Sequence, residues 1–244
     1  MKKARIVILS VYCLFVHLVT FAQQRQPFGA QVAMEMDLSK LISNTTHYIM
    51  KVKGKKVGSW EWQVKRRGRK VTFKDISILD GQVREDALIM FDAKLMEVTS
   101  MDVKMKFNGG NLIGKVKADG THIKADYVLK KGEQTQKKQV DTTLRWVARP
   151  LLIGLMPYIK LKPKQVQKMN VFSLTSANFW KMQLEVLEEV IVRVPAGEFQ
   201  TQKIALRSKD PGSVSNIIYV SKSLPRKIIR VDVVGRGMKI ELVK

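Results

Sequence analysis

The residues that could do chemistry are few and widely spaced in this chain of 244 residues. Outside the apolar N-terminal stretch the histidines are His47 and His122, and they lack the spacing of a metal site. The only cysteine, Cys13, lies inside that apolar stretch. The sequence has no G-x-S-x-G nucleophile elbow, no H-E-x-x-H motif and no phosphate-binding loop. We therefore expect no catalytic residue, no metal and no cofactor, so the chain is not expected to be an enzyme.

Three weaker motifs do not change this expectation. Gly235-Arg236-Gly237 lacks the third glycine and the following helix of a dinucleotide fingerprint, and Glu188-Glu189 has no paired-carboxylate spacing. Asn44-Thr45-Thr46 matches a glycosylation sequon, a pattern that arises often by chance. Carboxylates that are distant in sequence could still meet in space, so a glycosidase-like pair stays open as a distant alternative. A binding or structural role is favoured.

Lysines recur at every second position in parts of residues 101–132. They alternate with apolar residues such as Met101, Val103, Met105 and Phe107, and turn sequences containing Gly109 and Gly120 separate the runs. Because successive side chains of a β-strand point to opposite faces, the pattern predicts three amphipathic strands with a lysine-coated outer face. We expect this face to contact anionic surfaces through Lys104, Lys106, Lys115, Lys117, Lys124 and Lys130.

The whole chain is strongly basic, with 44 Lys and Arg against 21 Asp and Glu and a formal net charge of +23. Such a charge attracts lipid head groups, acidic polysaccharides or nucleic acid without naming one of them. Residues 1–22 have the layout of a secretory signal peptide, with basic Lys2, Lys3 and Arg5, an apolar run and a small residue at Ala22. Cleavage after Ala22 would place the protein in the periplasm or outside the cell. Nucleic acid is then not an expected partner, and the mature chain has no second apolar stretch long enough to span a membrane.

The mature chain is predicted to form a single domain. Residues 23–45 are expected to be partly disordered or to hold a short helix near Asp37, and residues 46–244 to form one antiparallel β domain. Roughly ten to twelve short strands joined by glycine turns indicate a mainly β fold, an antiparallel meander forming a curved half-barrel or barrel.

One stretch breaks the strand rhythm. Apolar residues in Asp141–Tyr158 recur with helical spacing, Asp141 or Thr142 could cap a helix, and Pro150 predicts a kink in it. This helical insert is either a plug for the concave face of the sheet or a lid over an apolar cavity, and a plug is favoured. If a cavity exists, Leu151 and Leu152 should form its rim. The candidate ligand-binding residues are Trp60, Trp62, Met105, Phe107, Leu151 and Leu152.

The sequence Val-Pro-Ala-Gly-Glu-Phe at 194–199 resembles the exported bacterial family called domain of unknown function 3108. An early hairpin at Gly54-Lys55-Lys56, the segment 91–98, the apolar insert and the strand–proline–strand stretch 218–230 follow in the order of that family. Tyr219 stands where the family often has tryptophan. The resemblance runs from about Thr46 to Lys244. The resemblance implies a periplasmic, mostly antiparallel β protein, a half-barrel similar to the lipoprotein carriers of the cell envelope, and it brings no catalytic residue.

The function expected from the sequence is that of an exported, non-enzymatic cell-envelope protein. It would bind an apolar or lipid ligand on the concave sheet face and meet anionic envelope surfaces with its lysines. The alternative is a structural or protein-binding module with a filled core. An enzyme acting on envelope polysaccharide is the more distant alternative.

Overall fold

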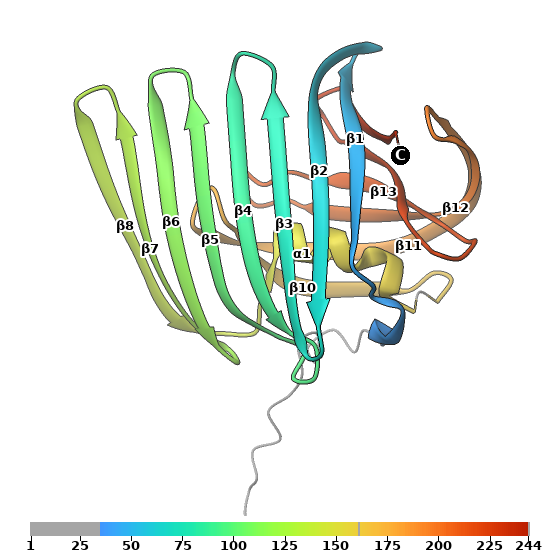
Figure 1. Ribbon diagram of the computed structural model, residues 1–244, viewed down its shortest axis with the longest axis horizontal. Helices are drawn as coiled ribbons and strands as arrows, with labels where there is room; N and C mark the ends of the chain where they lie inside the picture. Colours follow the sequence, from blue (N-terminus) through green and yellow to red (C-terminus); the bar gives the residue numbers. More distant parts are fainter. Residues whose placement is uncertain (1–34, 161, 244) are drawn as a thin grey trace, which may run out of the picture.

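In the computed structural model, one long curved sheet of 15 strands makes up most of the chain (Figure 1). The structure describes residues 35–160 and 162–243; the predicted signal peptide over 1–22 and residues 23–34 lie outside the described residues. The strands are β1 (Asn44–Val52), β2 (Lys55–Arg67), β3 (Lys70–Leu79), β4 (Val83–Asp92), β5 (Glu97–Phe107), β6 (Gly110–Asp119), β7 (His122–Lys131), β8 (Gln134–Thr143), β9 (Val147–Ala148), β10 (Val166–Ser173), β11 (Asn178–Val194), β12 (Gly197–Ser208), β13 (Asn216–Ser221), β14 (Ile228–Val233) and β15 (Met238–Leu242).

Two antiparallel meanders are joined into this one sheet. Strands β1–β8 and β10–β15 each follow chain order, and β1 pairs with β15 to connect them. Only the short β9 pairs in parallel, with β10. Figure 1 shows β1–β8 as a front layer and β10–β13 crossing behind it, so the sheet curls over on itself without closing. The predicted mainly β, curved antiparallel half-barrel with one short helical insert is confirmed.

The hairpin turns follow from glycine. Gly54, Gly109 and Gly120 have φ values of 80°, 77° and 57°, in the left-handed region that side chains with a Cβ disfavour. Tight turns of this kind let each strand pair directly with the next along the chain. The lysine-rich strands predicted within residues 101–132 are β5, β6 and β7.

The two edges of the sheet approach each other through side chains. Lys138 on the edge strand β8 donates through Nζ to the carbonyl of Ser176 at 3.0 Å and to Oδ1 of Asn178 at 2.6 Å. Ser176 lies in the turn between β10 and β11 and Asn178 is the first residue of β11, near the opposite edge. Trp146 also packs edge-on against Phe172, with ring centroids 5.9 Å apart. These contacts make the curled sheet barrel-like although no backbone pairing closes it.

Alternating inward side chains build the core between the layers. Tyr48 stacks on Trp60 with ring centroids 4.5 Å apart, and Trp62 stacks on Phe73 at 5.4 Å. Phe73 meets Phe91 edge-on at 6.0 Å. This aromatic row crosses β1 to β4 and faces the insert that lies between the two layers (Figure 1).

The insert differs from its prediction at its start. Residues Gln134–Thr143 form β8, so Asp141 and Thr142 belong to a strand and cap no helix. Helix α1 spans Arg149–Leu155 after the N-cap Ala148, and a 3-10 turn, η2, spans Met156–Tyr158. The predicted kink at Pro150 was wrong, because Pro150 lies in the first turn, where its missing N–H is not needed. Another 3-10 turn, η1, spans Leu38–Lys40 behind the N-cap Asp37.

Candidate functional site

The six residues predicted to bind a ligand are not brought together on an open concave face. Trp60, Trp62, Leu151 and Leu152 are buried in the core, with Leu151 0% and Leu152 1% exposed. Met105 and Phe107 are half-buried at one end of β5. Leu151 and Leu152 therefore form no rim, and the rim prediction was wrong. The prediction failed because the side chains of Leu151 and Leu152 point into the packed interior.

An apolar groove lies instead at one end of the sheet. Three segments far apart in sequence meet there: η1 with the start of β1, the turn η2, and the loop between β13 and β14. The groove has a volume of about 550 Å³. Its apolar side chains include two that are widely exposed, Ile42 at 59% and Leu224 at 66%. It is lined by Asp37, Lys40, Ile42, Asn44, Pro157, Tyr158, Ile159, Lys160, Leu224, Pro225, Arg226 and Lys227.

Four basic side chains, Lys40, Lys160, Arg226 and Lys227, line this groove. Arg226 is held in place because its guanidinium donates to the backbone carbonyls of Ser221 at 3.2 Å and Ile159 at 3.1 Å. Burial lowers the pKa of Arg226 below its usual value, but an arginine remains charged at neutral pH.

Two of these cations have acidic partners in the first described residues. Lys160 pairs with Glu35, which raises the pKa of Lys160, and Lys40 lies 3.3 Å from Asp37. Four cations against two acids leave the mouth of the groove positively charged. The groove thus combines an apolar surface with a positive rim.

A second, smaller cavity lies between the two layers of the sheet. It has a volume of about 250 Å³ and is bounded by β1–β4, the start of α1 and the strands β13–β15. Trp60 is the one predicted ligand-binding residue that lines it. Its charged lining residues are Asp75, Glu85, Arg149 and Arg236.

The two carboxyl groups in this cavity, those of Asp75 and Glu85, have raised pKa values. Trp60 Nε1 donates to Oδ1 of Asp75 at 2.6 Å, and Glu85 pairs in register with Ser77, two residues from Asp75 on the same face. Burial raises the pKa of Asp75 to about 6 despite the Trp60 hydrogen bond and the positive charge of Arg149. Burial, together with the charge of Asp75, raises the pKa of Glu85 to about 7. Near neutral pH the pair therefore retains part of a proton.

Arg149 is the counter-charge of these acids. Burial lowers its pKa, and the charges of Glu85 and Asp75 act in the opposite direction. Its Nε is buried and has no hydrogen-bond partner among the residues that the structure describes. The sequence analysis did not select Asp75, Glu85 or Arg149. The alternation of inward and outward side chains on β3 could have identified Asp75, because Asp75 continues the inward row of Val71 and Phe73.

The six lysines predicted on the outer face are all exposed. They lie on β5, β6 and β7, and Lys117 stands opposite Lys124 in register. Acids interrupt the row: Lys115 pairs in register with Asp102 and Asp126. The face is therefore basic but not uniformly so, and contact with anionic surfaces stays a prediction.

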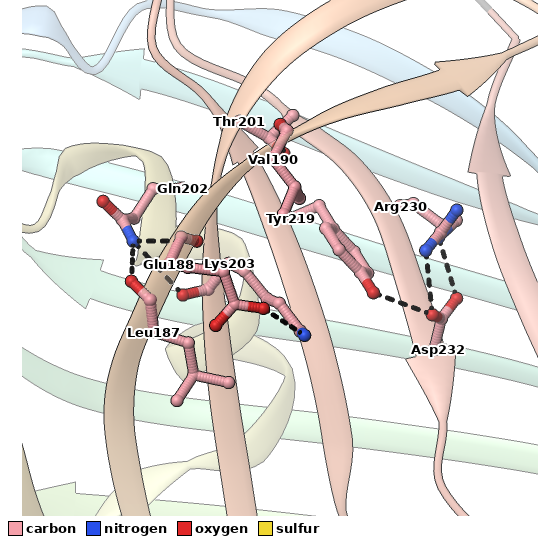
Figure 2. Close-up of polar contacts among 9 residues, drawn as sticks. All are labelled: Leu187, Glu188, Val190, Thr201, Gln202, Lys203, Tyr219, Arg230 and Asp232. Carbon is pink, nitrogen blue, oxygen red and sulfur yellow. Dashed lines mark hydrogen bonds and ion pairs between the residues drawn. The ribbon is translucent and has the colours of Figure 1, made fainter.

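A polar network fastens the irregular part of β11 to β12 (Figure 2). The pairing of β11 with β12 shifts its register between Val186 and Glu189, so Leu187 has no partner residue on β12. Gln202 Nε2 donates to the backbone carbonyl of Leu187 at 2.5 Å. Lys203 Nζ lies 2.6 Å from Oε1 of Glu188, and Lys222 Nζ lies 2.5 Å from Oε2 of Glu189. Because both acids are paired with lysines, Glu188 and Glu189 form no carboxylate pair for catalysis.

A second polar cluster lies on β13 and β14, where Tyr219 stands opposite Lys203 in register. Tyr219 donates through Oη to Oδ2 of Asp232 at 3.1 Å, and Arg230 lies 2.9 Å from Oδ1 of Asp232 while covering the ring of Tyr219 at 4.2 Å (Figure 2). The guanidinium of Arg230 is thus held by this ion pair and by the face of the Tyr219 ring, although Nε of Arg230 and Oδ1 of Asp232 form no well-aligned hydrogen bond among the described residues. This arrangement stabilises strand pairing.

Within residues 35–160 and 162–243, no group of three or more histidine, cysteine, aspartate or glutamate side chains could hold a metal ion. The helices described in the structure include none that is long and apolar enough to cross a bilayer.

Comparisons with known proteins identify the fold. No family model matches the chain, and no curated protein matches it. One similar solved structure is a crystal structure of a β-barrel-like protein of domain of unknown function 1849 from Brucella abortus, with a TM-score of 0.55 and 10% sequence identity. The match covers 83% of this chain and 96% of that chain. At this identity the likeness shows the fold alone: the chain has a β-barrel-like fold that is also found in a domain of unknown function.

Proposed function

We propose that this chain is an exported, non-enzymatic cell-envelope protein that binds an anionic single-chain amphiphile in the groove at the end of the sheet. The observation that supports this most is the pairing of exposed Ile42 and Leu224 with the basic rim of the same groove. The signal-peptide pattern of residues 1–22 and the resemblance to domain of unknown function 3108 support export.

The size and chemistry of the groove fit such a ligand. A volume of about 550 Å³ falls within the range of roughly 300–1,000 Å³ that is usual for small-molecule sites. An acyl chain would cover Ile42, Leu224 and the ring of Tyr158, and each buried methylene would contribute about 0.8 kcal/mol. An acidic head group would meet Arg226 and Lys227 at the rim. The ligand site is thus at the end of the sheet, while the concave face is largely filled by the core.

Changing Ile42 and Leu224 together to serine should weaken binding of a fluorescent fatty acid about tenfold, equivalent to about 1.4 kcal/mol. Both side chains are exposed, so the melting temperature should change little. A matched control changes Ile113 and Ile191, exposed at 41% and 63% on other strands, to serine. The control should bind the probe like the wild type, and equal loss in both variants would contradict a site in the groove.

Residues 23–34 directly precede Glu35, which pairs with the groove residue Lys160, so their removal tests them as a competing occupant. A chain that begins at Glu35 should bind the fatty acid with the affinity of residues 23–244. A large gain on removing the segment would instead identify it as the occupant. If neither form binds, the filled core leaves a structural or protein-binding module as the remaining function.

We also propose that the lysine face brings the protein to anionic membrane surfaces. Each lysine near such a surface contributes up to about 1 kcal/mol. Changing Lys104, Lys106, Lys115, Lys117, Lys124 and Lys130 to glutamine should abolish sedimentation with anionic liposomes, and salt should weaken the wild type because exposed charges are screened over about 10 Å at 0.1 M. Binding that survives either treatment would refute this role.

A further inference from the structure

We propose that the interior cavity, which the amphiphile site does not use, binds a small primary ammonium ligand with a hydrogen-bond acceptor beside its cation. This chemistry is shared by amino acids, amino alcohols and amino sugars. The cation would lie at Asp75 and Glu85, and the acceptor would take the Nε–H of Arg149.

The cavity is a bounded space with a polar end. Its apolar walls come from strands of both layers and from α1, and its acids stand on β3 and β4. Asp75 is only 8% exposed and follows the fully buried Phe73 in the same inward row. The space of about 250 Å³ suits a ligand of amino acid or monosaccharide size and is too small for a lipid.

Two buried hydrogen-bonding groups that interact with Glu85 lack hydrogen-bond partners within the described part of the chain. They are Nε of Arg149, a residue that lines the cavity, and Oη of Tyr127, which lies outside its lining; burial, and to a smaller extent the charge of Glu85, raises the pKa of Tyr127. A buried donor without a partner is unfavourable, because it has lost its hydrogen bond to water. A ligand that accepts a hydrogen bond from Arg149 would remove this penalty.

The charges select a cation over an anion. Asp75 and Glu85 line the cavity together with the half-buried Arg149, whose Nε is buried. Arg236 also lines the cavity, but it lies at the exposed β14–β15 turn, where solvent screens its charge, and Asp86 lies on the outer side of β4. With both acids ionised, the buried cluster lacks one positive charge, and protonation supplies it in the free protein. An ammonium ion can replace that proton, so binding should release a proton and tighten as pH rises through about 6 to 7. An anion would instead meet the two carboxylates.

The test titrates the mature protein with glycine, ethanolamine, glucosamine, propylamine and acetate by calorimetry and by the indole N–H resonance of Trp60. Trp60 reports directly because its Nε1 donates to Asp75. At least one of the first three should bind about tenfold more tightly than propylamine, which lacks the acceptor, and acetate should not bind. The preferred ligand also distinguishes amino acids, amino alcohols and amino sugars.

Two variants locate the site. Glu85→Gln should weaken binding of the preferred amine at least tenfold and remove most of its pH dependence. Asp86→Asn, on the opposite face of the same strand, should bind like the wild type. If Glu85→Gln does not fold, the wild-type Trp60 resonance still decides: an amine-dependent shift that grows above pH 6 supports the site. Absence of any shift at millimolar amine, or equal binding of acetate, overturns the proposal.

Discussion

Replacing Leu151 with alanine is expected to lower the free energy of unfolding by about 2–5 kcal/mol, as large-to-small changes in a packed core do. Leu151 is 0% exposed and belongs to the core cluster beneath α1. The removed methyl groups would leave an unfilled space, because neighbouring side chains relax only partly. Urea unfolding followed by tryptophan fluorescence measures the change.

Leu224→Ala is the matched control for Leu151→Ala. The same chemical change at a side chain that is 66% exposed should alter stability by less than about 0.5 kcal/mol. A small loss at Leu151, accompanied by weaker fatty-acid binding, would restore the view that α1 covers an open cavity. A large loss with unchanged fatty-acid binding would support the solid core and the groove at the sheet end.

Replacing Gly154 with alanine is expected to destabilise the protein by about 1–3 kcal/mol, although alanine favours helix by up to about 1 kcal/mol over glycine. A Cβ at Gly154 would lie 1.9 Å from Cζ2 and 2.4 Å from Cε2 of Trp62. The helix must therefore move away from β2, or the indole must leave its stack on Phe73. Steric overlap outweighs helix propensity at this position.

A double-mutant cycle with Trp62→Phe tests the cause of this loss. The smaller ring frees the space that a Cβ at Gly154 would enter, so the double variant should lose less stability than the sum of the two single variants. Simple additivity of the two changes would contradict direct contact between Gly154 and Trp62 as the cause.

Strand alternation predicted most of the sheet because one face of each strand is buried. It failed at β8, where nearly every residue from Gln134 to Thr143 is polar and exposed on both faces. An edge strand of this kind carries no apolar row, so only its pairing with β7 defines it. The helical spacing that seemed to start at Asp141 arose by chance across the boundary between β8 and α1.

The binding sites depend on contacts that no local pattern contains. The groove joins Ile42, Tyr158 and Leu224 from three parts of the chain. The acids of the interior cavity were partly predictable, because Asp75 and Glu85 occupy inward positions of alternating strands. Their partner Arg149 was not, since its place beside them depends on how α1 crosses between the layers.

The most direct test of the proposed function is native mass spectrometry of the protein purified from the cell envelope. The account predicts a protein mass that corresponds to residues 23–244, together with a bound species of the mass of an acidic single-chain lipid. The bound species should be lost when Ile42 and Leu224 are changed to serine, and it should persist in the Ile113 and Ile191 control. Wild-type protein without a bound lipid, or a lipid that stays bound to the groove variant, would contradict the account.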